Sequence, residues 1–183
     1  MKLYQVILFV HAVSVLMLAA SLSCEAWMLF QLRRAVSMSD LQAWINPVRG
    51  LSVMTTVSLV IVELTGAYLT DRLNSWQFAW PKLAFWAVVL VGLLGGLSGR
   101  RLRMIRRSCI EGKIKQTILL RHYFLKLSLN IRIWLVLGVL LLTVVKAGVV
   151  GSASIVLASL VIGLISTAFP FGKTTEGASV SRL

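Results

Sequence analysis

Four ionisable side chains lie inside long apolar stretches of this 183-residue chain, at His11, Glu25, Glu63 and Lys146. Each one is a candidate functional residue, because a charged or titratable group in hydrocarbon is costly. The neutral imidazole of His11 can be an axial ligand of haem iron. A histidine, a carboxyl group and an amine close together can instead relay protons.

The same residues also have an ordinary structural interpretation. Lys146 ends an apolar stretch, so its amine can reach the lipid headgroups. Glu63 can pair with Lys146 or carry a proton, and His11 can hydrogen-bond a neighbouring helix, as polar residues in membrane bundles often do. From the residues alone, both interpretations stay open.

The composition indicates a membrane protein. The hydrophobic fraction is 58%, only 14% of residues are charged, and the mean hydropathy is +0.87. A soluble domain has about 45–50% apolar and about 25% charged residues. These values argue against a soluble globular protein, a disordered chain and a disulfide scaffold. They also argue against a nucleic-acid partner despite the net charge of +13, because a basic patch needs a solvated face.

Five stretches are long enough, or nearly so, for a membrane-spanning helix, which needs about 20 mainly apolar residues. They are Leu3–Phe30, Leu51–Leu69, Leu83–Leu97, a stretch from after Tyr123 to Val145, and Val149–Phe169. We therefore expect an all-α, polytopic transmembrane helical bundle of about five spans. Residues 1–147 form a four-span core, 148–169 a fifth span and 170–183 a cytoplasmic tail. The alternative for 131–169 is a shorter hairpin.

The positions of the basic residues predict the orientation. With five spans, 15 of the 19 Lys and Arg residues fall on one side of the membrane. Basic residues favour the cytoplasmic side, so we expect the N-terminus outside and the C-terminus inside a bacterial cytoplasmic (inner) membrane. His11, Glu63 and Lys146 then share the outer half. The aromatic residues expected at the outer interface are Tyr4, Tyr68, Trp76, Trp80 and Trp86.

Residues 100–130 form the longest basic segment. Apolar residues recur there at helical spacing between Arg and Lys, which predicts a helix that extends from the third span. We expect this cytoplasmic segment to lie on anionic lipids, with an acidic partner as the alternative. His122 lies among these charges and is expected to be solvated.

Small residues recur in the third and fifth spans. Gly92 and Gly96 form one pair at a spacing of four, and Gly95 and Gly99 form another. The fifth span is similarly rich in Gly, Ala and Ser. Small residues let helices approach closely in lipid, which predicts packing within the bundle, with a homo-oligomer as the alternative.

Three residues near the inner side of the expected topology are weaker candidates for a functional site. Glu25 falls near the inner surface, within reach of Arg33 or Arg34, so we expect it to be interfacial. Cys24 and Cys109 lack the spacing of a metal or haem-attachment motif, and both face a reducing compartment, so no disulfide is expected.

Three short segments resemble a superfamily of small bacterial membrane proteins. They are Leu8–His11, Leu64–Leu69 and Leu141–Lys146, and the resemblance covers about residues 1–147. The superfamily includes integral membrane proteins of unknown function, copper-resistance D-type proteins and four-helix protoporphyrinogen oxidases linked to haem b. The resemblance implies a four-helix fold with His11 and Lys146 as the pair related to haem.

Three hypotheses for the function follow. The first is a membrane protein that binds haem b near the outer leaflet and transfers electrons, with His11 as the metal ligand and Glu63 and Lys146 beside the cofactor. The second is a cofactor-free subunit or scaffold of a larger redox or transport complex. The third is an enzyme that resembles protoporphyrinogen oxidase.

Overall fold

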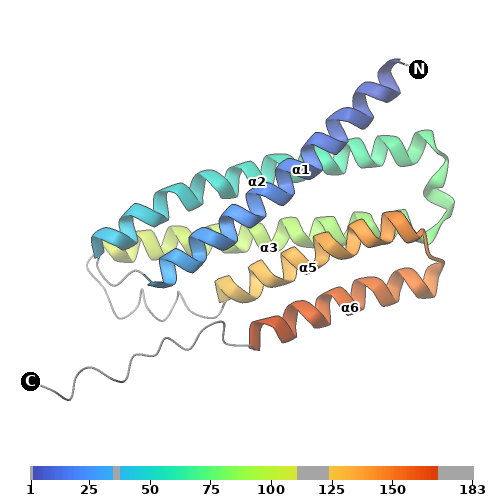
Figure 1. Ribbon diagram of the computed structural model, residues 1–183. Helices are drawn as coiled ribbons and strands as arrows, with labels where there is room; N and C mark the ends of the chain where they lie inside the picture. Colours follow the sequence, from blue (N-terminus) through green and yellow to red (C-terminus); the bar gives the residue numbers. More distant parts are fainter. Residues whose placement is uncertain (1, 35–37, 111–123, 169–183) are drawn as a thin grey trace, which may run out of the picture.

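The computed structural model describes residues 2–34, 38–110 and 124–168, and over these residues the chain is all-α (Figure 1). The five long helices are α1 (Lys2–Arg34), α2 (Met38–Arg72), α3 (Ala79–Ile110), α5 (Phe124–Val145) and α6 (Val149–Ala168). A short 3-10 helix, η1 (Ser75–Gln77), connects α2 to α3. No strand occurs in the described residues.

Each of the five helices contains a segment long and apolar enough to cross a membrane. Large apolar side chains are exposed on the outside of the bundle, for example Phe9 at 69%, Leu16 at 70% and Val150 at 80%. Surfaces of this kind are stable against lipid, and helices satisfy their own backbone hydrogen bonds there. The expected multi-pass helical bundle in contact with the bilayer is thus confirmed.

The helices extend beyond the apolar stretches that predicted them. α3 continues to Ile110, which confirms the expected helical extension of the third span, because arginine is a good helix former. α5 begins at Phe124, which confirms the expected start of the fourth span after Tyr123. The end of the 100–130 segment, including Lys126, therefore belongs to a helix of the bundle and not to a cytoplasmic segment. Residues 111–123 of the basic segment and the tail from 169 onward lie outside the described residues.

The helices run alternately up and down along the bundle (Figure 1). The N-terminus, the α2–α3 connection and the α5–α6 connection lie at one end, which we call the N-terminal end. α1 packs along α2, α3 lies between α2 and α5, and α6 packs on α5. The first turns of α1 extend beyond the neighbouring helices.

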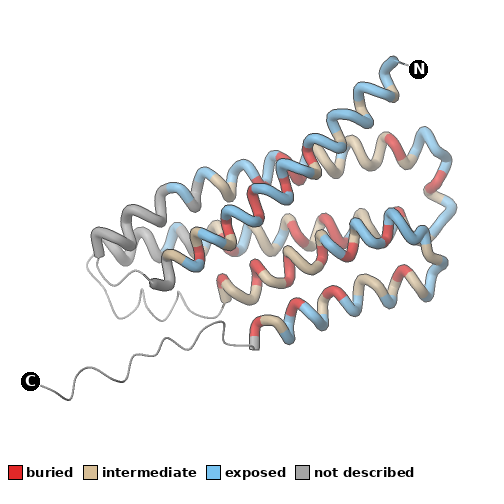
Figure 2. Tube along the Cα trace, viewed as in Figure 1, coloured by how far each residue is buried: buried red, intermediate tan, exposed pale blue. Residues whose placement is uncertain are grey.

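Buried residues alternate with exposed ones along the helices (Figure 2). On α1 the buried residues form a stripe that contains Leu18, Leu22, Glu25 and Leu29, and the members recur every three or four residues. On α5 it contains Leu125, Leu129, Arg132, Leu135 and Leu142. The two charged residues therefore lie at positions of the helical repeat that face the core.

α5 and α6 form a closely packed hairpin. A Cβ atom on Gly163 would come within 2.9 Å of Ile131 Cα, and one on Gly138 would collide with Ser159 Oγ. Lys126 Nζ donates a 2.7 Å hydrogen bond to the carbonyl of Thr167 in the last turn of α6. The expected packing role of small residues in the fifth span is confirmed at these contacts.

We predict that Gly163→Ala destabilises the protein by about 1–3 kcal/mol, because the added methyl group meets the backbone of α5. Gly96→Ala is the matched control, since nothing lies within 4 Å of a Cβ atom there. Thermal unfolding in detergent, followed by circular dichroism, measures both. Equal melting temperatures for the two variants would contradict the close α5–α6 contact.

Candidate functional site

A cavity of about 310 Å³ lies near the N-terminal end of the bundle, between α1, α2, η1, α3 and α5. Its wall is mostly apolar. Leu8 of α1 and Leu140 and Thr143 of α5 line it and are also exposed, so the cavity opens at the surface of the bundle.

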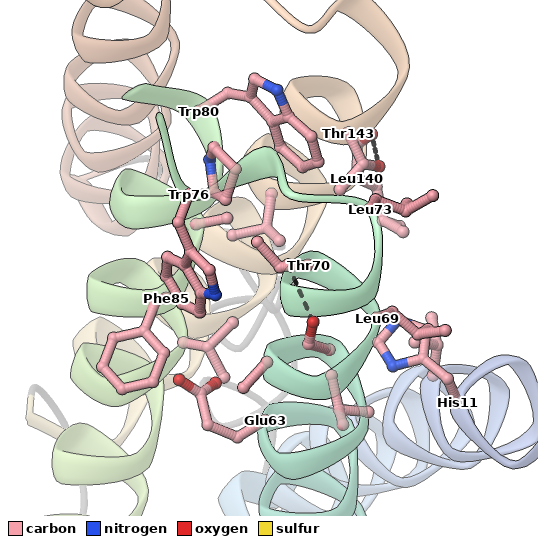
Figure 3. Close-up of a pocket in the computed structure, with 18 of the residues that line it drawn as sticks. His11, Glu63, Leu69, Thr70, Leu73, Trp76, Trp80, Phe85, Leu140 and Thr143 are labelled. Atoms are coloured by element: carbon pink, nitrogen blue, oxygen red, sulfur yellow. Dashed lines mark hydrogen bonds between the residues drawn. The ribbon is translucent and has the colours of Figure 1, made fainter. Parts of the chain in front are cut away.

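Aromatic side chains form one side of the cavity. Trp76 comes from η1, and Trp80 and Phe85 come from α3 (Figure 3). The rings of Trp76 and Phe85 pack edge to face, with their centroids 6.5 Å apart. Trp76 and Trp80 were expected at the outer interface, and the structure places both in the cavity wall.

His11 lines the cavity from α1, and Thr65 of α2 fixes its ring. His11 Nδ1 lies 2.8 Å from Thr65 Oγ1, and Thr65 Oγ1 donates to the carbonyl of Ile61 at 2.6 Å. Because the hydroxyl proton is used by Ile61, His11 Nδ1 is the donor to Thr65. The neutral ring then has its lone pair on Nε2, which is the arrangement of a metal-binding histidine.

Gly66 makes room for this ring. A Cβ atom at Gly66 would lie 3.3 Å from His11 Cε1, closer than most such contacts. The short segment Leu64–Leu69 therefore has a packing function, since its glycine accommodates the histidine of the neighbouring helix.

Glu63 lines the same cavity from α2 and points toward α3, near Phe85 (Figure 3). Its Oε1 atom is buried and has no hydrogen-bond partner among the described residues. The hydroxyl groups of Thr70 and Thr143 also line the cavity, but both donate to backbone carbonyls of their own helices. The ionisable groups left for a ligand are therefore the His11 ring and the Glu63 carboxyl group, beside the indole N–H donors of Trp76 and Trp80.

Lys146 does not line this cavity. Lys146 has a φ of 48°, which is a left-handed backbone conformation. Its backbone N–H donates to the carbonyl of Leu142 at 3.0 Å, so Lys146 caps the C-terminal end of α5. Its side chain is exposed. The structure thus brings His11 and Glu63 to one cavity and leaves Lys146 outside it.

The wall provides little for a metal ion beyond His11. Among the described residues, no group of three His, Cys, Asp or Glu side chains could hold a metal ion. The cavity wall also contains no methionine, lysine or arginine. A haem there would have His11 as its one axial ligand from the wall, without a basic partner for its propionates.

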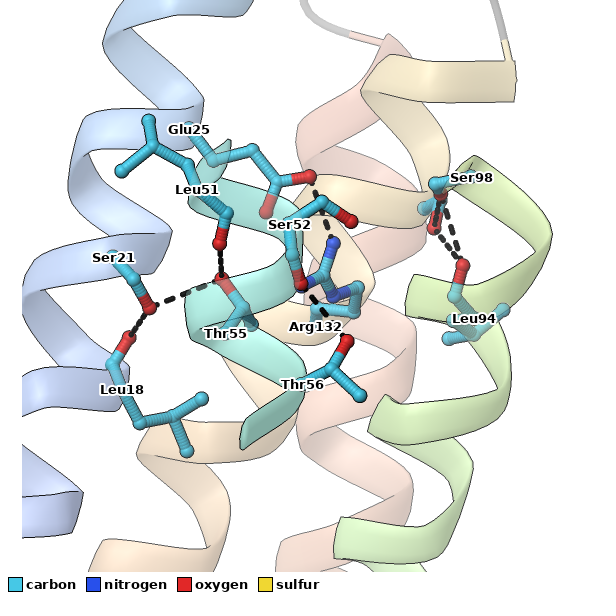
Figure 4. A network of polar contacts seen from close by, with 11 residues as sticks. Leu18, Ser21, Glu25, Leu51, Ser52, Thr55, Thr56, Leu94, Ser98 and Arg132 are labelled. Atoms are coloured by element: carbon cyan, nitrogen blue, oxygen red, sulfur yellow. Dashed lines mark hydrogen bonds and ion pairs between the residues drawn. The ribbon is translucent and has the colours of Figure 1, made fainter. Parts of the chain in front are cut away.

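A second polar site, which the sequence reasoning missed, lies deeper in the bundle. Arg132 Nη1 of α5 lies 3.0 Å from Glu25 Oε1 of α1, and the two side chains are only 3% and 2% exposed (Figure 4). Glu25 is therefore buried and not interfacial as expected, and its described partner is Arg132, while the side chains of Arg33 and Arg34 lie outside the described part of the structure. The sequence could have indicated their burial, because each residue of the Glu25–Arg132 pair occupies a position in its helix that shares a face with the apolar residues.

Small and hydroxyl residues surround this ion pair. A Cβ atom at Gly95 of α3 would lie 3.5 Å from the Arg132 guanidinium group, so the glycine lets this group approach the helix. Thr55 donates to Ser21 at 3.0 Å, joining α2 to α1, and Ser98 donates to Ser128 at 2.7 Å, joining α3 to α5. A polar layer thus connects four helices inside the bundle (Figure 4).

No protein-family model, curated protein or solved structure matches this chain. Functional inference therefore depends on the cavity, its two polar groups and the buried ion pair.

We predict that Glu25→Met and Arg132→Met each destabilise the protein by about 3–5 kcal/mol, because each leaves the other charge buried without its partner. The double variant Glu25→Met/Arg132→Met should be much closer to wild type, since it removes both charges. Unfolding in mixed micelles of increasing denaturing detergent content measures all three variants. Additive losses in the double variant would show that the two residues do not interact.

Proposed function

We propose that this protein binds a small, mostly apolar molecule inside the membrane, in the cavity between α1, α2, α3 and α5. The observation that carries the proposal is the cavity itself. Its volume of about 310 Å³ is at the lower end of the range of about 300–1,000 Å³ for ligand pockets. Such pockets combine an apolar wall with a few polar groups that orient the ligand. Here His11 and Glu63 are these groups.

The position of the opening supports a ligand taken up from the lipid. The exposed residues at its edge, Leu8 and Leu140, are apolar and come from helices that are themselves apolar enough to span a membrane. An apolar molecule concentrates in the bilayer before it binds. The protein is then a carrier, sensor or cofactor-binding subunit that works on membrane-dissolved molecules.

We predict that Ala84→Phe, which fills the cavity, weakens binding of neopentylbenzene at least about tenfold, because a ring replaces the space for the probe. Ala158→Phe on the exposed face of α6 is the matched control and should bind as wild type does. Equilibrium dialysis in detergent measures binding, with protein-free micelles as the blank. Equal uptake by wild type and Ala84→Phe would refute the cavity as a binding site.

Haem b is the second candidate, and the His11–Thr65 hydrogen bond favours it. A histidine whose Nδ1–H is held by a partner presents Nε2 to iron in a fixed orientation. The resemblance to haem-linked membrane proteins supports the same choice, although Lys146 is not part of the cavity. A bound haem would supply one-electron exchange, which fits an electron-transfer function near the outer leaflet.

If haem is the ligand, we predict that the purified protein shows a Soret absorption band and that His11→Ala removes it, because the axial ligand is lost. His122→Ala, which changes the other histidine of the chain, should keep the band. Absorption spectra after expression with added haem precursor make the comparison. A colourless wild-type protein would exclude the haem candidate and its oxidase-like variant, and would favour a cofactor-free subunit.

We also propose an orientation with the N-terminal end outside, in a bacterial inner membrane. The N-terminal end of the bundle contains few basic residues, namely Lys2, Arg72, Lys82 and Lys146. The opposite ends of the helices contain many more, namely Arg33, Arg34, Arg49, Arg100, Arg101, Arg103, Arg106 and Arg107. This distribution follows the preference of basic residues for the cytoplasmic side.

A further inference from the structure

We propose, on the basis of the binding function above, that the cavity selects a lipophilic cation. Such a ligand has an apolar body and one positively charged nitrogen. Glu63 then recognises the charge, and aromatic rings of the same cavity, beginning with the neighbouring Phe85, contact the ligand (Figure 3).

Glu63 has a carboxyl oxygen that no described residue satisfies. Its Oε1 atom is buried and makes no hydrogen bond within the described residues. Withdrawing a carboxylate from water costs free energy unless an opposite charge or a donor compensates. The other carboxylate in a span, Glu25, has such a partner in Arg132. A cationic ligand would supply a compensating positive charge to Glu63, as Arg132 does to Glu25.

The basic side chains described at the N-terminal end of the bundle do not take this place. Arg72 Nε donates to the Tyr68 hydroxyl at 3.0 Å, and its guanidinium group lies over the same ring. Lys146 is exposed at the end of α5. Lys2 and Lys82, the other basic residues at this end, are also exposed, and none of the four lines the cavity. Among the described residues no positive charge complements Glu63, and a cationic ligand can supply it.

The aromatic wall favours an organic cation. The faces of aromatic rings attract cations, and tryptophan attracts them most strongly. Two tryptophans and a phenylalanine line the cavity, and Figure 3 shows Glu63 on the same side as Phe85. An alkylammonium group can contact the carboxylate and the rings together. An inorganic cation would need several oxygen ligands, and the described residues form no such group.

The rest of the cavity wall determines the polarity and shape of the uncharged part of the ligand. Leu69, Val88, Val139 and Leu140 offer only apolar contacts. A compact hydrocarbon group fits them and also lets the cation partition into the membrane. Anionic molecules, including the propionates of a haem, meet no basic side chain in this wall.

The test compares two probes of nearly equal shape. Benzyltrimethylammonium has a quaternary nitrogen where neopentylbenzene has a neutral carbon. Equilibrium dialysis in detergent, with protein-free micelles as the blank, gives the affinity of each probe for wild type, Glu63→Gln and Asp71→Asn. Asp71 is exposed at the end of α2 and does not line the cavity, so Asp71→Asn controls for loss of one negative charge.

We expect wild type and Asp71→Asn to bind the cation at least about tenfold more tightly than the neutral probe, since a desolvated cation over aromatic rings gains at least a factor of ten. Glu63→Gln should lose this preference and keep its affinity for neopentylbenzene. Equal binding of both probes by wild type would overturn the cation proposal and leave the binding function standing. Binding of neither probe would overturn both, and a preference that survives in Glu63→Gln would overturn the role of Glu63.

Discussion

A charge inside the hydrocarbon layer needs a compensating partner, and the Glu25–Arg132 ion pair meets this requirement at the centre of the bundle. Each residue lies on the buried stripe of its helix, so their attraction fixes which faces of α1 and α5 point inward. It also joins the hairpin of α1 and α2 to the group formed by α3, α5 and α6. The hydroxyl pairs around it act within each part, since Thr55–Ser21 joins α2 to α1 and Ser98–Ser128 joins α3 to α5.

The two carboxyl groups in the spans show opposite solutions to one problem. Glu25 is paired through Oε1 with an arginine from another helix, although its Oε2 atom and Arg132 Nε have no hydrogen-bond partner among the described residues. Glu63 lies beside an open cavity with a buried oxygen that no described residue satisfies. Along α1, Glu25 and His11 are 14 residues apart, or about 21 Å at 1.5 Å per residue. The structural pair and the binding cavity therefore occupy different levels of the bundle.

Hydropathy predicted the five spans well because apolar length is a direct requirement of the bilayer. It did not predict the ends of α2 and α3, since a helix continues past the hydrocarbon wherever its residues favour helix. His11 and Glu63 were found as charges that interrupt apolar runs, and both line the cavity. The pairing of Arg132 with Glu25 was missed because Arg132 was counted among the basic residues of the cytoplasmic side and Glu25 was expected near Arg33 and Arg34. Which helices contact each other at a given height of the bundle depends on tertiary packing, and a local sequence pattern does not predict it.

The separation of Glu25 and Arg132 along the chain affects the order in which the ion pair can form during synthesis. The two residues are 107 positions apart. At a synthesis rate of about 5–20 residues per second, the ribosome adds Arg132 roughly 5–20 s after Glu25. During this interval α1 and α2 enter the membrane with a carboxyl group whose partner does not yet exist. The early hairpin has to accommodate Glu25 alone, and the arrival of α5 then completes the core.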